Sequence, residues 1–452
     1  MKVDKIPNRD VFCNSPWYEL HIFWDGSFGY CCAQTPHRPY SENLKAFYNI
    51  KTMSIADWHR STPMKEHRLA MFTDDKMSAC NACWHQENFG STSRRHKANI
   101  KSVIFKQEFA ESFTQSPNYD VFENSYLNGG DTPQLPMDLH IDLGNYCNLA
   151  CKMCNPEASS KIASQYNKWD VLGNYKIATD WTKDDAVWDN FVNQILDINL
   201  QNIHFMGGET LITPRFEDLI DALIKNKRYD LCISFVTNGT VFNKKIMGKL
   251  SKFKRVGIEI SIESMTKHNE YIRQGTKNSV VVENIHKYID TRNRWNEWCN
   301  SNFDVTIRPA VSLLSIGYYY TLLQFCLDEQ ILLKSNNVIR EVGWNDSKCL
   351  DIRILPSNVK AQYMENYTKL LDSIDADDLI DDFNESDSHN YRNVIRDECN
   401  KCITLLSSSM EHDLYPDLIE LLEKWDKVYD LNANELYPEL NDLLTEYNYS
   451  VG

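Results

Sequence analysis

Short apolar runs alternate with helix-like stretches through the middle of the chain. Six runs rich in β-branched and aromatic residues predict strands, and the stretches between them have helical spacing. One such stretch is Phe216–Lys225, where Leu219 and Leu223 share a face and Thr213 precedes the helix as a candidate N-cap. The predicted strands are Leu139–Leu143, Ile203–Met206, Leu231–Val236, Val256–Ile262, Phe303–Val311 and Asp351–Leu355.

This alternation predicts an α/β fold, because parallel strands need crossover helices between them. Six strand–helix units predict a partial (β/α)6 TIM-like barrel over residues 137–356. In that architecture the chemistry lies at the C-terminal ends of the strands.

Two further segments flank this core. Residues 1–128 predict a small α+β domain, and a Gly- and Pro-rich breaker cluster predicts a linker at 129–136. Residues 357–452 predict an acidic helical C-terminal extension, because Leu418 and Leu422 fit one amphipathic helix and Leu440, Leu443 and Leu444 fit another.

The net charge of −15 lies in that extension, which holds 22 Asp and Glu against 7 Lys and Arg. Such a surface repels nucleic acid and acidic membranes. The short basic run Arg94–Lys97 predicts a solvated loop. No apolar run is long enough to span a bilayer, and the first twelve residues lack a signal-like apolar segment, so we expect a cytoplasmic protein.

Fourteen cysteines are many for a cytoplasmic chain, where clustered thiols indicate metal binding or catalysis. Cys147, Cys151 and Cys154 form a CxxxCxxC group directly after the first predicted strand. Three thiolates on one loop can bind three irons of a cubane cluster and leave the fourth iron open. A structural zinc site needs four protein ligands, and no fourth Cys or His lies nearby in sequence.

A second group of cysteines precedes the core. Asp25-Gly26 between apolar residues predicts a hairpin with a two-residue turn, which would bring the first two cysteines together. A CxxC pair then completes a Cys₄ site for zinc or a [4Fe–4S] cluster, and spacing alone favours zinc. The four predicted ligands are Cys13, Cys31, Cys80 and Cys83.

The other cysteines predict no site. Strand alternation would turn Cys32 to the opposite side of the hairpin as a core thiol. Cys399 and Cys402 are interpreted as two helix cysteines, and the rest are expected to be isolated buried thiols: Cys232, Cys299, Cys326 and Cys349.

The core motifs resemble the radical S-adenosylmethionine (SAM) superfamily. After the second, third and fourth predicted strands come a Gly-Gly-Glu motif, a Thr-Asn-Gly motif and the sequence Ser261–Ser264, and a loop similar to YIRxGT follows. Glycines allow close approach, and a carboxylate can accept hydrogen bonds from the SAM ammonium. Met153 occupies the position of a typical aromatic residue. The resemblance implies SAM contacts from Met153, Gly207, Gly208, Glu209, Thr237, Asn238, Ser261, Glu263 and Arg273.

The N-terminal cysteines resemble the SPASM and twitch modules that carry auxiliary clusters in the same superfamily. Those modules combine a cysteine, a hairpin with Asp-Gly, another cysteine and a later CxxC. The resemblance implies one auxiliary [4Fe–4S] cluster in place of zinc. Family modules usually follow the core, whereas this one precedes it.

The resemblance implies an enzyme that cleaves SAM reductively and abstracts hydrogen from a substrate with the 5′-deoxyadenosyl radical. The auxiliary cluster would transfer electrons. The expected partners are a small-molecule or peptide substrate and an electron donor such as flavodoxin or ferredoxin. Two alternatives stay open: a peptide- or protein-modifying maturase, and a non-catalytic metal-binding interaction protein that retained the fold. A zinc-stabilised nucleic-acid binder conflicts with the acidic charge.

Overall fold

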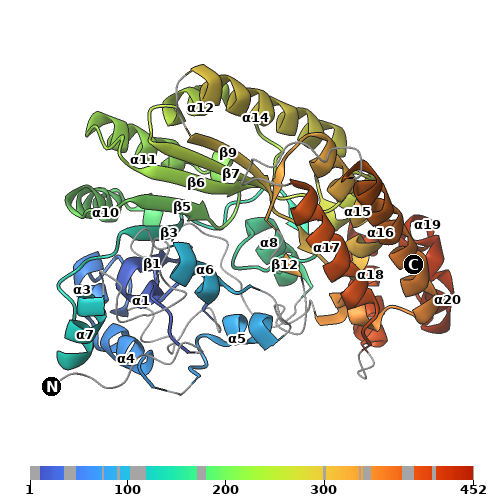
Figure 1. Ribbon diagram of the computed structural model, residues 1–452, viewed down its shortest axis with the longest axis horizontal. Helices are drawn as coiled ribbons and strands as arrows, with labels where there is room; N and C mark the ends of the chain where they lie inside the picture. Colours follow the sequence, from blue (N-terminus) through green and yellow to red (C-terminus); the bar gives the residue numbers. More distant parts are fainter. Residues whose placement is uncertain are drawn as a thin grey trace.

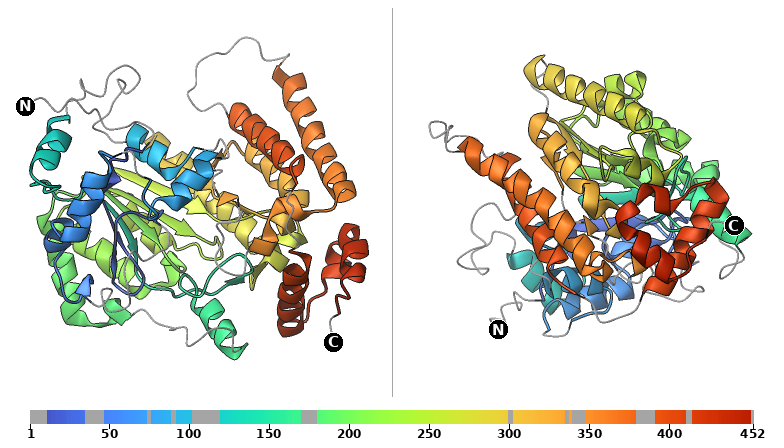
Figure 2. Two further views of the ribbon diagram at one scale, coloured as in Figure 1. Left: turned by 90° about the horizontal axis from the view of Figure 1, so that it is seen from below. Right: turned by 90° about the vertical axis from the view of Figure 1, so that its right-hand side faces the viewer.

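A computed structural model gives the structure of the chain (Figure 1). Its central feature is a mostly parallel sheet with helices α10, α11, α12 and α14 along one face. The C-terminal helices lie at the end of the molecule opposite the N-terminal segment (Figure 2). The structure describes residues 11–34, 47–73, 76–88, 92–101, 119–169, 180–298, 302–334, 337–338, 348–378, 391–409 and 414–450.

The main sheet has eight strands in the order β11-β9-β7-β6-β5-β3-β1-β2. All neighbouring pairs are parallel except β1 and β2, which form an antiparallel hairpin. The predicted α/β class with a parallel sheet is therefore confirmed, and β11 and β2 are the edge strands of the sheet among the described residues. The strands are β1 (Glu19–Ile22), β2 (Phe28–Gly29), β3 (Asp138–Asp142), β5 (Asn202–Met206), β6 (Cys232–Thr237), β7 (Arg255–Ile260), β9 (Asn302–Ile307) and β11 (Leu332–Leu333).

Five of the six predicted strands are present, but Asp351–Leu355 is not a strand. It contains the 3₁₀-helix η4 (Ile352–Ile354), and β11 is the sixth core strand instead. The Asp351 carboxylate accepts hydrogen bonds from the backbone N–H of Arg353 at 2.9 Å and from its guanidinium, which closes the turn. A short apolar run does not distinguish a buried turn from a strand, and this explains the error.

Alternation along each strand divides the sheet into an apolar outer face and a polar inner face. The outer residues are buried against helices, as where Phe216 of α11 contacts Phe205 and Phe235 with ring centroids 4.8 and 5.4 Å apart. Thr213 takes the N-cap position of this helix, but its hydroxyl donates to the carbonyl of Glu209. The core helices are α8 (Ser160–Lys168), α9 (Asp180–Lys183), α10 (Asp185–Asp197), η2 (Thr210–Ile212), α11 (Pro214–Lys225), α12 (Lys244–Leu250), α13 (Lys267–Ile272), α14 (Asn278–Trp298) and α15 (Leu313–Asp328).

The N-terminal hairpin extends the core sheet. Strand β1 pairs in parallel with β3, so the proposed linker 129–136 joins two segments that share one sheet. The predicted hairpin is present, but its turn is longer than two residues: the N–H of Phe23 donates to Ser27, and Gly26 has a φ of +85°. The helices of this segment are α1 (Ser15–Tyr18), α3 (Ile55–His59), α4 (Thr62–Ala70), α5 (Asn81–Asn88), α6 (Arg94–Lys101) and α7 (Tyr119–Leu127).

The C-terminal extension is helical, as expected. Leu418 and Leu422 are buried on α18, and Leu443 and Leu444 are buried on α20. No described helix is both long and apolar enough to cross a membrane. The elements are η3 (Lys348–Leu350), α16 (Ser357–Asp378), α17 (Tyr391–Leu406), α18 (Tyr415–Tyr429), α19 (Ala433–Leu436), η5 (Pro438–Leu440) and α20 (Asn441–Glu446).

The isolated cysteines fit the expectation in part. Cys399 and Cys402 are buried on α17, and Cys326 and Cys349 are also buried. Cys232 is only partly buried, and Cys299 lies outside the described residues.

One buried arginine connects the pieces of the N-terminal segment. The Arg68 guanidinium on α4 donates to the carbonyls of Pro16, His59 and Gly130 at 3.0, 2.7 and 3.1 Å. A single side chain therefore joins α1, the end of α3 and the linker.

We predict that Arg68→Met destabilises the N-terminal segment by about 3 kcal/mol, because three buried carbonyls lose a charged donor. Urea unfolding followed by tryptophan fluorescence measures this, since Trp17 and Trp58 are buried in the same segment. The matched control is Lys65→Met: Lys65 lies on the same helix as Arg68, and its change breaks a half-exposed ion pair with Asp131. That change should cost less than about 1 kcal/mol, and equal effects of the two variants would contradict the prediction.

Candidate active site

The three cysteines of the CxxxCxxC group lie together beyond the C-terminal end of β3. Cys151 is in the short strand β4 (Ala150–Cys151), which pairs antiparallel with β8 (Arg273–Gln274). Burial raises the pKa of all three thiols, and the other two thiols also raise that of Cys151. Two donors point at the sulfurs: Leu149 N–H to Cys147 at 3.5 Å and the Arg273 guanidinium to Cys151 at 3.7 Å.

This arrangement fits an iron–sulfur cluster. The thiolates are unfavourable when buried alone, and a metal cluster would compensate their charge. N–H groups that donate to ligand sulfurs are a usual feature around such clusters.

The Gly-Gly-Glu motif packs directly against this cysteine loop. A Cβ atom on Gly208 would lie 2.0 Å from the carbonyl oxygen of Tyr146, and one on Gly207 would lie 2.6 Å from that of Gly144. The glycines are required because the two loops approach so closely.

Glu209 is buried, at 1% exposure, and connects the Gly-Gly-Glu and Thr-Asn-Gly motifs. Its carboxylate accepts hydrogen bonds from the Thr237 hydroxyl at 2.8 Å, the Asn238 N–H at 2.7 Å and the Leu211 N–H at 3.1 Å. Burial raises its pKa, although these donors oppose the shift. The Asn238 side chain then donates to Asn148 of the cysteine loop at 2.8 Å.

Glu263 and Arg273, both predicted to contact SAM, pair with each other. The guanidinium donates to both carboxylate oxygens, at 2.5 and 2.6 Å, and both side chains are buried. Burial alone would lower the pKa of Arg273, but Glu263 and Cys151 outweigh it and raise the value. Arg273 therefore lies between a carboxylate and a cysteine of the loop.

Ser261 and Met153 complete the predicted set. The Ser261 N–H donates to the carbonyl of Thr237 at 2.8 Å, which places it beside the Thr-Asn-Gly motif. Met153 is partly buried and packs against the core.

The N-terminal cysteines also lie near one another. Burial raises the pKa of Cys31, and Glu19, Cys32, Cys83 and Cys80 raise it further. Cys13 in turn raises the pKa of both Cys80 and Cys83 after burial. The hairpin and α5 therefore bring the four predicted ligands into one neighbourhood, next to an apolar cluster of Phe12, Trp17, Tyr18, Met71 and Phe122. Cysteine thiols are ligands of zinc and of iron–sulfur clusters, so this neighbourhood is a candidate metal site.

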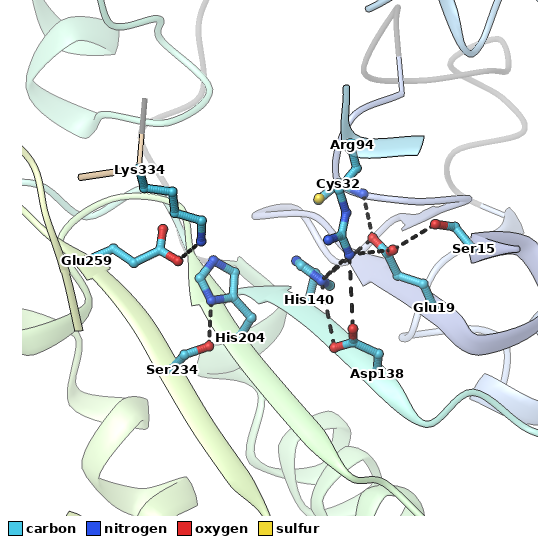
Figure 3. Close-up of polar contacts among 10 residues, drawn as sticks. All are labelled: Ser15, Glu19, Cys32, Arg94, Asp138, His140, His204, Ser234, Glu259 and Lys334. Carbon is cyan, nitrogen blue, oxygen red and sulfur yellow. Dashed lines mark hydrogen bonds and ion pairs between the residues drawn. The ribbon is translucent and has the colours of Figure 1, made fainter. Parts of the chain in front are cut away.

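Cys32 is not a core thiol. Its N–H donates to Glu19 at 3.2 Å, and its sulfur lies within 4.8 Å of the Glu19 carboxylate and His140 imidazole (Figure 3). Strand β2 ends at Gly29, so strand alternation does not set the direction of Cys32. These three groups could hold a metal ion, but the Arg94 guanidinium lies 2.6 Å from Glu19 and 3.1 Å from His140 and already supplies a cation.

The basic run Arg94–Lys97 is therefore not a solvated loop. It begins α6, and Arg94 holds the pKa of Glu19 at about 2 against the opposite effect of burial. The next residue, Arg95, is buried and pairs with Glu87 at 2.7 Å. Arg94 pairs with a buried carboxylate 75 residues away, and a local charge pattern does not indicate such a partner.

A second polar group lies further along the inner face. Glu259 of β7 pairs with Lys334 and with Arg308, whose guanidinium lies 2.5 Å away. His204 shares a 2.7 Å hydrogen bond with Ser234, and burial lowers its pKa (Figure 3). Neither polar group was expected from the sequence, although polar and apolar residues alternate in β3 and β5 and so indicate a polar face.

Comparison with known proteins agrees with this geometry. The model of an iron–sulfur cluster-binding domain, SPASM, matches residues 13–84 of the N-terminal segment. The model of the radical SAM superfamily matches residues 141–296. The chain therefore contains a domain that matches the radical SAM superfamily and, before it, one that matches the SPASM iron–sulfur cluster-binding domain. These domains imply a [4Fe–4S] cluster with SAM, and auxiliary iron–sulfur binding.

Individual relatives are distant. GTP 3′,8-cyclase of Campylobacter fetus is 26% identical over 180 residues, which are 40% of this chain and 48% of that protein. PqqA peptide cyclase of Gluconobacter oxydans is 24% identical over 135 residues, 30% of this chain and 32% of that protein. The chain thus spans less than half the length of these relatives. The solved structure of Streptococcus suis SuiB bound to S-adenosylmethionine has 14% identity and a TM-score of 0.31, covering 69% of this chain and 62% of that one.

We predict that Gly208→Ala removes iron from the Cys147–Cys154 site, because the added Cβ would collide with the backbone of the cysteine loop. Iron content after anaerobic purification measures this. The control is Gly248→Ala on α12, where a Cβ has open space. That variant should keep its iron and gain up to about 1 kcal/mol of stability from helix propensity. Full iron in Gly208→Ala would contradict the prediction.

Proposed function

We propose that this chain is a radical SAM enzyme whose Cys147, Cys151 and Cys154 hold a [4Fe–4S] cluster with one open iron. The observation that supports this most is the packing of the Gly-Gly-Glu and Thr-Asn-Gly motifs around the cysteine loop. With cluster and SAM bound, the site would supply reductive cleavage of SAM and a 5′-deoxyadenosyl radical that abstracts hydrogen from substrate.

The surrounding residues have two kinds of role in this proposal. Glu209 orients Thr237 and Asn238 by hydrogen bonds, so these three would form the wall that receives SAM. Arg273 donates to Cys151 while Glu263 fixes the guanidinium, so this pair would orient a ligand of the cluster. The proposed SAM contacts also include Met153, Gly207, Gly208 and Ser261.

An auxiliary [4Fe–4S] cluster on Cys13, Cys31, Cys80 and Cys83 would exchange electrons with the substrate. The parallel pairing of β1 with β3 supports this, because it sets the N-terminal segment beside the core sheet. An electron donor such as flavodoxin or ferredoxin would reduce the protein, and we propose the cytoplasm as its location.

The inner face of the sheet would receive a polar substrate. It presents Glu19 with Arg94 and His140, and Glu259 with two cations. Hydrocarbon substrates would leave these charges poorly solvated. The names of PqqA peptide cyclase and GTP 3′,8-cyclase refer to a peptide and a nucleotide, both polar. A peptide side chain or a small polar molecule is therefore the proposed substrate class.

The first test replaces the three cysteines of the loop. Cys147→Ala/Cys151→Ala/Cys154→Ala should lose about four irons and all release of 5′-deoxyadenosine from SAM under reducing conditions, because no ligand for that cluster is left. The double variant Cys399→Ala/Cys402→Ala on α17 is the matched control and should keep both. Release of 5′-deoxyadenosine by the triple variant would reject the proposal, and none from the native protein would favour a non-catalytic metal-binding protein.

Metal analysis tests the auxiliary site. About eight irons and no zinc per chain would indicate two cubane clusters. Cys31→Ala should lose the auxiliary iron, whereas Cys32→Ala should keep it, since the Cys32 sulfur lies beside Glu19 and His140. About four irons with one zinc, or iron loss only in the Cys32 variant, would refute the ligand assignment.

A further inference from the structure

The C-terminal extension contacts the residue that directly follows Cys151 of the cysteine loop. Strands β4 and β8 form a two-residue ladder that carries Cys151 on one strand and Arg273 on the other. The ladder continues at Lys152, whose N–H donates to the carbonyl of Ile272 at 2.9 Å and whose ammonium donates to that of Tyr271 at 3.2 Å. Lys152, which follows Cys151, is therefore hydrogen-bonded to the two residues that precede Arg273.

A carboxylate of α18 contacts both Lys152 and Tyr271. Asp426 lies 3.9 Å from the Lys152 ammonium, and both side chains have no exposure to solvent. The Tyr271 hydroxyl donates to the same carboxylate at 3.1 Å. The ammonium also lies over the rings of Tyr271 and Trp425, 3.8 and 5.2 Å from their centroids.

Asp426 is itself fixed by its own segment. It accepts hydrogen bonds from the Tyr449 hydroxyl at 2.6 Å and from the Ala433 N–H at 2.9 Å. These two hydrogen bonds come from the C-terminal segment itself and hold the carboxylate in place beside the ladder. A fully buried carboxylate and ammonium are unfavourable apart, so each requires the other in place.

We propose that Asp426 is a positioning residue for the cluster. Through its contacts with Lys152 and Tyr271, Asp426 holds the β4–β8 ladder, and the ladder keeps Cys151 and Arg273 in place. The helical extension is then a functional part of the cluster site. This inference rests on the proposed cluster at Cys147, Cys151 and Cys154. The role of Asp426 resembles that of residues that support the metal ligands at other sites, where removing such a residue weakens metal binding about 10- to 100-fold.

The test compares Asp426→Asn with Glu420→Gln, which breaks an exposed ion pair with Lys424 on the same helix. Loss of iron to a chelator is followed at both sites by the EPR spectra of the reduced protein with and without SAM. Asp426→Asn should release iron from the SAM-responsive site about 10- to 100-fold faster than wild type. Its auxiliary site should release iron at the wild-type rate, and so should both sites of the Glu420→Gln protein.

Equal release rates in Asp426→Asn and wild type would overturn the proposal, and so would equal acceleration at both sites, which indicates general destabilisation. If Asp426→Asn does not fold, Tyr449→Phe removes one hydrogen bond to the carboxylate and leaves the ladder intact. It should show the same preference for the SAM-responsive site, and wild-type rates would again overturn the proposal. A wild-type protein without any SAM-responsive signal would refute the proposed function instead.

Discussion

The parallel pairing of β1 with β3 is the constraint on which the rest of the structure depends. It joins the N-terminal cysteines to the core sheet, and it sets Glu19 and His21 beside Asp138 and His140. The cysteine loop leaves the C-terminal end of β3, and the hairpin leading to Cys31 leaves the same end of β1. One register of backbone hydrogen bonds therefore fixes the relation between the two groups of cysteines. It also explains how a module placed before the core can lie beside it.

Buried ion pairs are the second recurring feature. Arg94 with Glu19 and Lys152 with Asp426 join segments far apart in sequence, and Arg273 with Glu263 joins β8 to the segment that follows β7. A buried pair contributes little net stability, but it penalises any arrangement that separates the partners. These pairs surround the cysteine loop and the inner face, where the positions of a few atoms matter most.

Local patterns predicted most of the fold and the motifs, because strand alternation, helix spacing and cysteine spacing are properties of short segments. Five core strands, the hairpin and α11 could be found in this way. Two of the errors have the same cause, because the partner of the residue is distant in sequence. Arg94 pairs with a glutamate 75 residues earlier, and Asp426 lies far from the loop it contacts. The turn at Asp351 differs, because there a short apolar run was compatible with two structures.

The order of the strands along the chain has a consequence for biosynthesis. Strands β1 and β2 are made first, but the partner β3 follows about 120 residues later, so one edge of β1 has no partner while the chain grows. An unpaired edge can bind the edges of other nascent chains. The buried Arg68, whose contacts within the N-terminal segment form as soon as the linker appears, would keep this segment compact during the delay. We therefore expect recombinant yield to depend on translation speed and chaperones more than on final stability.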